Sequence, residues 1–144
     1  MKKFKFSLEK VLAYRKQVEE QLKTELINKR EEHRALVEEL DFLRAKYSEF
    51  KRSLGEGRIE ARRLAHWNER SLFLEDLIDK QAEMVEQSLS RLRELQKKYI
   101  EARRSSMVLE KLKEKKIAQY KYEVSREIQK GLDEFATSAY ARGS

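Results

Sequence analysis

The feature that most constrains this chain is a heptad repeat of mostly apolar residues. Between Leu22 and Leu54 these residues recur in alternating steps of four and three positions without a break. Apolar residues about every 3.5 positions keep one stripe of a supercoiled helix facing a partner helix. The pattern therefore predicts a coiled-coil helix whose seam, the stripe that faces the partner, is made of Leu22, Leu26, Lys29, His33, Leu36, Leu40, Leu43, Tyr47, Phe50 and Leu54.

The composition leaves few places where the chain can reverse direction. It contains no proline and only four glycines among 144 residues. Gly55 and Gly57 form the one cluster of helix-breaking residues in the body of the chain, so we expect a turn there. The sequence thus predicts an all-α fold: an antiparallel two-helix coiled coil with helices over about 7–54 and 58–138, in a single coiled-coil domain of residues 1–144.

The unequal helix lengths predict that the second helix extends past the first. A chain that folds back at Gly55–Gly57 places Leu8 near Arg104, and residues after about Val108 then have no partner within the chain. This unpaired part still carries an apolar stripe as far as Phe135. Since an isolated helix rarely exposes such a stripe to water without a function, we infer a partner protein that binds it.

The charge of the chain is unevenly distributed. The formal net charge is +7 at pH 7. Lysine and arginine are concentrated in residues 1–30 and 97–130, whereas residues 31–96 are mildly acidic. An antiparallel arrangement brings the two basic segments to the same end of the molecule. This polarity suits contacts with two different partners.

No catalytic or metal-binding pattern is present in the sequence. It has no cysteine and no glycine-rich phosphate loop, and neither His33 nor His66 has a histidine or a carboxylate four residues further on. Two packed helices also offer no enclosed pocket in which Ser105 and Ser106 could join a catalytic set. We expect no enzymatic activity, no cofactor and no metal. No apolar run reaches the roughly 20 residues that span a bilayer, so we expect no membrane insertion.

Two alternative functions fit part of the pattern. The pairs Lys97–Lys98 and Arg103–Arg104 could neutralise phosphates of a nucleic acid. Glutamates such as Glu101 and Glu114 are interleaved with the basic residues, which favours a solvated helix face instead. The other alternative is a homo-oligomeric scaffold in which the unpaired stripes of two chains pack together.

Apolar residues are crowded in the first part of the second helix. Residues 72–78 hold more large apolar side chains than one seam can bury, so some of Leu72, Phe73 and Leu77 must face water or a partner. Trp67, the only tryptophan, is either a seam residue or an exposed aromatic anchor of an interface. This segment suggests a second contact surface near the turn.

Both ends of the chain resemble the family of the flagellar export protein FliJ. The opening stretch 4–12, FKFSLEKVL, resembles the start of that family, and the closing stretch 127–136, EIQKGLDEFA, resembles its E-x-Q-K-x-L-D-E-x-A motif. The stretch 109–112, LEKL, is also similar. The likeness spans the whole chain in length and helix order.

The resemblance implies a two-helix coiled coil similar to the central stalk of rotary ATPases. Family members are cytoplasmic, non-enzymatic parts of the flagellar type III export apparatus, at the inner-membrane face of the flagellar base. They bind the hexameric export ATPase FliI, promote its ring assembly and activity, and contact the export gate FlhA and export chaperones. The resemblance thus implies protein partners, with no nucleic acid among them.

Two groups of contact residues follow as hypotheses. Matching by helix order places the gate contact near Trp67, Leu74, Leu77 and Gln81. The unpaired stripe and the basic end indicate an ATPase contact formed by Leu109, Leu112, Lys115, Lys116, Gln129, Asp133 and Phe135.

Overall fold

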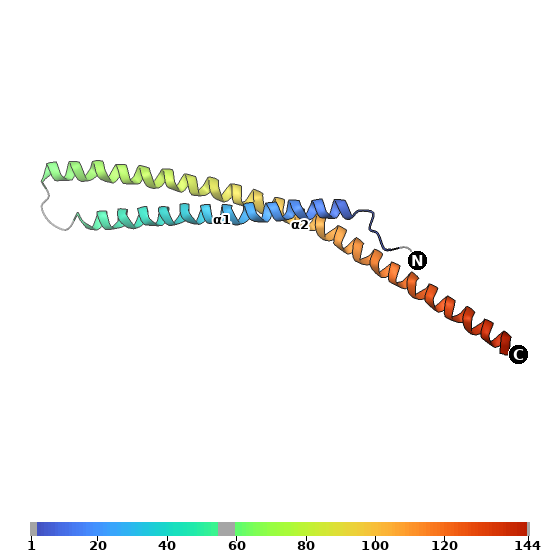
Figure 1. Ribbon diagram of the computed structural model, residues 1–144. Coiled ribbons are helices and arrows are strands. Elements are labelled where there is room, and N and C mark those ends of the chain that lie inside the picture. The colour runs from blue at the N-terminus through green and yellow to red at the C-terminus, as the bar shows by residue number, and fades with distance from the viewer. Residues whose placement is uncertain (1–2, 55–59, 144) are drawn as a thin grey trace. The chain divides into compact units, whose positions relative to one another are not determined.

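The computed structural model describes residues 3–54 and 60–143 and contains two long helices (Figure 1). Helix α1 spans Glu9–Arg52, and helix α2 spans Ala61–Gly143. These described ranges contain no β-strand. The predicted all-α fold of two packed helices, the second longer, is confirmed. The predicted turn at Gly55–Gly57 lies outside the described residues.

The ends of the helices follow from local chemistry. Glu9 lies in the first turn of α1, and Lys51 and Arg52 lie in its last turn. These charges oppose the partial charges of the helix dipole and stabilise both ends. Helix α2 continues through Gly131 to Gly143, beyond the end predicted near residue 138.

The chain forms two structural units, which we describe separately. The middle unit comprises residues 21–99. The terminal unit comprises residues 1–20 and 100–144, of which 3–20 and 100–143 are described. In each unit a part of α1 packs antiparallel against a part of α2.

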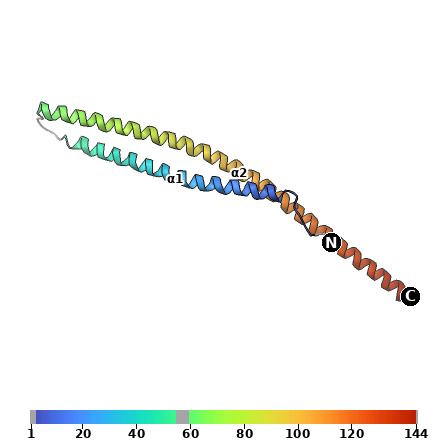
Figure 2. The same cartoon turned by 45° about the horizontal axis from the view of Figure 1, so that its top comes forward.

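The middle unit is held by a narrow apolar seam with polar contacts inside it. Figures 1 and 2 show its portion of α1 beside the first part of α2. Leu26, Leu40 and Leu92 are buried. His33 Nδ1 lies 3.1 Å from Ser88 Oγ, so a predicted seam histidine has a hydrogen-bonding partner on the facing helix. Such polar pairs within a seam favour one register over its alternatives.

The terminal unit combines a small core with ion pairs. Leu12 and Ser106 are buried, and the Ser106 hydroxyl donates a hydrogen bond to Glu19. Lys16 lies 3.0 Å from Glu110 across the two helices. Glu19 is thus half-buried between the two helices of the terminal unit and has a partner on α2.

The alignment of the helices in the terminal unit differs from the prediction. A tight turn would place Leu8 near Arg104, but the next residue, Glu9, forms a 2.8 Å ion pair with Lys113. The prediction that residues after Val108 have no partner within the chain is therefore wrong.

The middle unit is displaced in the same sense. Trp67 stacks on Phe50 and Gln81 bonds to the Leu36 carbonyl, whereas a tight turn at Gly55–Gly57 would pair these α1 residues with earlier positions of α2. In the terminal unit, the last described α2 residue that is partly buried is Val124.

Candidate partner-binding surfaces

The last part of α2, residues 125–143, is a helix on which no other described segment of the terminal unit packs. Every described residue from 125 to 143 is exposed. Ile128, Leu132 and Phe135 keep 60%, 58% and 76% of their surface accessible. Figures 1 and 2 show this red end of α2 continuing past the N-terminal segment with no second helix of the terminal unit beside it. An apolar stripe this exposed marks an interaction site.

The side chains of this segment are sorted by polarity around the helix. We define the C-terminal face as Ile128, Leu132, Phe135 and Ala139, which follow one another in steps of four, three and four. This spacing places them on one side of a helix. The charged residues of the same segment lie on the other side: Arg126, Glu127, Lys130, Asp133 and Glu134. The segment is therefore amphipathic, although no described residue of the terminal unit covers its apolar side.

Glycine 131 adds open space beside the C-terminal face. A Cβ atom placed on Gly131 would meet nothing within 4 Å. A partner helix or groove can therefore approach the backbone of α2 closely at this point, one residue before Leu132. Small residues at a helix surface permit such close approach.

The predicted ATPase-contact residues fall into two groups. Leu109 and Leu112 are half-buried within the terminal unit, so α1 and the segment before it already cover part of their surface. The remaining five are exposed, and Gln129 donates a 3.1 Å hydrogen bond to Asp133. These five are Lys115, Lys116, Gln129, Asp133 and Phe135. The predicted set omitted Ile128 and Leu132. Both lie on the apolar stripe of the sequence and could have been included on that ground.

A second apolar surface lies on α2 in the middle unit. Leu72 and Phe73 are 65% and 62% exposed. We call these two residues and the half-buried Leu77 the Phe73 patch. Phe73 and Leu77 are neighbours at a spacing of four residues, and the exposed carboxylates of Glu69 and Asp76 border them. The expectation that some of these side chains face outward is confirmed for Leu72 and Phe73.

Most of the predicted gate-contact residues instead face α1. The Trp67 ring stacks on Phe50 at 5.3 Å between centroids, which makes it a seam residue. Gln81 donates a 3.0 Å hydrogen bond to the Leu36 carbonyl. Leu74 is half-buried in the same seam. Of the predicted four, only Leu77 belongs to the Phe73 patch.

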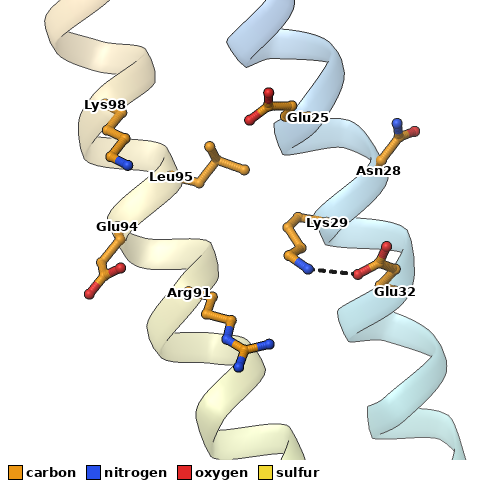
Figure 3. A pocket seen from close by; sticks show the side chains of 8 residues that line it. All are labelled: Glu25, Asn28, Lys29, Glu32, Arg91, Glu94, Leu95 and Lys98. Atoms are coloured by element: carbon orange, nitrogen blue, oxygen red, sulfur yellow. Dashed lines mark hydrogen bonds and ion pairs between the residues drawn. The ribbon is translucent and has the colours of Figure 1, made fainter.

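The middle unit also holds an open cavity of about 380 Å³ between its helices (Figure 3). Leu95 is the one apolar side chain among those that line it, and it points between the helices. Lys29 and Glu32 form a 2.9 Å ion pair at its edge. Three acidic and three basic side chains line this cavity: Glu25, Glu32, Glu94, Lys29, Arg91 and Lys98. Small-molecule sites are mostly apolar with a few polar groups, so this balanced lining is not typical of one.

Two other kinds of site are absent from the described residues. No group of three or more His, Cys, Asp or Glu in residues 3–54 and 60–143 is placed to hold a metal ion. Within the same ranges, neither helix contains a stretch long and apolar enough to cross a bilayer. The two apolar surfaces on α2 are thus the candidate functional sites.

Comparison with known protein families gives a match over nearly the whole chain. The chain matches the family model described as "Flagellar FliJ protein" over residues 4–144. No curated protein and no solved structure matches it. The match covers nearly all of the sequence, including both candidate surfaces. The chain therefore belongs to the flagellar FliJ family and is a component related to flagellar protein export.

Proposed function

We propose that this chain binds the hexameric export ATPase FliI through the C-terminal face and promotes its ring assembly and activity. It links the ATPase to the export gate FlhA and to export chaperones, in the cytoplasm at the inner-membrane face of the flagellar base. The observation that carries the proposal is the exposed apolar stripe of Ile128, Leu132 and Phe135 on α2.

Burial of this stripe supplies affinity for a partner. Each large apolar side chain that moves from water into a well-packed interface contributes about 1.5–3 kcal/mol. The C-terminal face carries three such side chains in two helical turns, in the pattern by which amphipathic helices dock into apolar grooves. Contact through one helix face requires no pocket in this chain.

Basic residues that precede the C-terminal face add long-range attraction. Lys115 and Lys116 are exposed on α2 within the terminal unit. Opposite charges on a partner surface raise the association rate and orient the encounter, more strongly at low salt. We infer that acidic loops of the ATPase ring face these lysines, so the stimulation should weaken as salt rises.

The Phe73 patch is the proposed contact with the export gate. It replaces the set predicted from helix order because Trp67 and Gln81 already have partners on α1. Leu72 and Phe73 are free to be buried by another protein. The change Phe73→Ser should weaken binding to the cytoplasmic domain of FlhA and leave the ATPase contact unchanged. Equal binding of wild type and of Phe73→Ser to the gate domain, measured by calorimetry, would contradict this assignment.

The experiment that tests the ATPase contact compares two double variants. Leu132→Gln/Phe135→Gln removes the apolar centre of the C-terminal face. Lys130→Gln/Glu134→Gln changes the opposite side of the same turns and, like the first variant, leaves the net charge unaltered. We expect the first variant to lose stimulation of ATP hydrolysis and ring formation, and the second to retain both. Equal stimulation by the two variants would contradict the proposal.

A second copy of the chain is the other partner that this face could bind. The C-terminal face carries no charged residue that would repel an identical face. Sedimentation equilibrium of the full chain separates the two functions. A monomer at micromolar concentration supports the ATPase contact, and a stable dimer that Leu132→Gln/Phe135→Gln dissociates supports the scaffold.

A further inference from the structure

The N-terminal arm, which we define as residues 3–8, packs on α2 ahead of the C-terminal face. Residues 3–6 have no regular secondary structure, whereas Phe4, Phe6 and Leu8 are half-buried. The Phe4 ring lies 5.6 Å from the Tyr120 ring, between centroids and in a tilted orientation. Such aromatic contacts are favourable beyond the area they bury. The arm therefore covers a part of α2 that lies beyond the start of α1.

The surface beneath the arm continues directly into the C-terminal face. Ile117, Tyr120 and Val124 are half-buried, and every described residue after Val124 is exposed. The steps from Ile117 to Ile128 are three, four and four residues, and the next step of four reaches Leu132. These spacings keep all five side chains on one side of α2. One apolar face thus runs from Ile117 to the C-terminal face, and the arm occupies only its first part.

The arm is held less firmly than α1 itself. Helix α1 is fastened to α2 by the ion pairs of Glu9 with Lys113 and of Lys16 with Glu110. Beside the arm lies an open cavity of about 570 Å³, bordered by Phe4, Phe6, Glu9 and Lys113 among others. The arm backbone is tied to α1 through the Phe6 and Leu8 carbonyls, which accept hydrogen bonds from the Glu9 and Leu12 amides, whereas residues 3–5 lie outside any helix. A segment outside regular secondary structure opens locally at a lower cost than a paired helix.

We propose that the N-terminal arm is an intramolecular competitor for the partner-binding face of α2. In the free chain its Phe4 ring lies against Tyr120, on the same side of α2 as the half-buried Ile117 and Val124. When the partner docks on the C-terminal face, the arm leaves and the partner extends its contact over these three residues. The inference rests on the proposed function, because it assigns a regulator to the surface that binds the export ATPase.

Competition of this kind has a measurable signature. A partner that needs the arm open binds with an affinity reduced by the fraction of molecules in which the arm is open. A locked arm should therefore weaken binding, and an arm without its aromatic anchor should strengthen it. A purely structural arm would give the opposite result on loss of Phe4, since the end of the terminal unit would loosen and binding would weaken.

A cross-link in the full chain tests the locked state. The chain contains no cysteine, so Phe4→Cys/Tyr120→Cys supplies a unique pair for a short bismaleimide. The matched control, Glu9→Cys/Lys113→Cys, fixes α1 at a point that has no need to open. We expect the cross-linked Phe4/Tyr120 variant to bind the export ATPase about tenfold more weakly than the same variant before cross-linking. The control should bind equally well before and after cross-linking.

A second pair of variants tests the open state. Phe4→Ala removes the aromatic anchor, and Lys5→Ala changes an exposed residue of the same arm. We expect Phe4→Ala to bind the ATPase about threefold to tenfold more tightly than wild type and Lys5→Ala to differ little. Circular dichroism should show equal helix content in all variants.

The outcomes separate the two proposals. If the ATPase binds the Phe4→Cys/Tyr120→Cys variant equally well before and after cross-linking, the competitor role alone is overturned. Weaker binding of Phe4→Ala also overturns it and assigns the arm a structural role. Absence of binding by wild type and by every open variant refutes the ATPase contact, and with it the competitor role.

Discussion

The middle unit and the end of α2 carry the same heptad pattern but differ in what covers it. In the middle unit, seam residues of α2 meet α1: Trp67 stacks on Phe50, and Gln81 bonds to the Leu36 carbonyl. After Val124 the stripe continues on α2, and every described residue is exposed. A heptad pattern thus specifies that a face needs a partner, but not that the partner is part of the same chain.

The largest expected effect separates the covered from the uncovered part of α2. A chain truncated after Val124 loses the C-terminal face and keeps every pair described between α1 and α2. We expect it to retain cooperative unfolding and to lose stimulation of the export ATPase. A chain truncated after Val108 should be less stable as well, because it also lacks the partners of Glu9 and Lys16. Full stimulation of the ATPase by the chain that ends at Val124 would show that the exposed end of α2 is not needed for binding.

A smaller effect compares equal substitutions in the two regions. Leu40 is buried in the middle unit, and Leu132 is exposed at the end of α2. We expect Leu40→Ala to lower the free energy of unfolding by about 2–4 kcal/mol. Leu132→Ala should change it by less than about 0.5 kcal/mol. Urea denaturation followed by circular dichroism measures both, and a comparable loss in the two variants would indicate that Leu132 is covered in solution.

The smallest expected effect concerns the helix backbone near the C-terminal face. Gly131 lies inside α2 with open space around it. The change Gly131→Ala should favour the helix locally by about 0.5–1 kcal/mol, because alanine loses less backbone entropy than glycine. Hydrogen exchange at residues 125–143 should then slow. If Gly131→Ala binds the ATPase more tightly, the change acts only by ordering the helix. If it binds more weakly, the added methyl group obstructs a partner backbone that approaches α2 at this point.

Much of the fold could be predicted from the sequence because a heptad seam is a strong and repetitive signal. The seam from Leu22 to Leu54 and the scarcity of turn residues together indicated two long helices. The register could not be predicted, because a heptad pattern does not say which residues of the two helices lie opposite each other. Specific pairs such as His33 with Ser88 and Ser106 with Glu19 favour one register over its alternatives.

The candidate site could be predicted in part. Phe135 and the exposed lysines were identified because a stripe without an internal partner was expected near the C-terminus. The N-terminal arm was not foreseen as a cover for α2, since residues 3–6 have no regular structure and hence no periodic signal. Trp67 could not be assigned to seam or surface, because tryptophan is common in both environments.

Hydrogen exchange of the full chain, with and without the export ATPase, tests the central claim most directly. The account predicts that amides of residues 125–143 exchange fast in the free chain and become protected when the ATPase is added. Amides around Leu26, Leu40 and Leu92 should be slow in both states, because these buried residues lie in the paired seam. Protection confined to the middle unit, with residues 125–143 unchanged, would contradict the claim that the C-terminal face is the partner-binding surface.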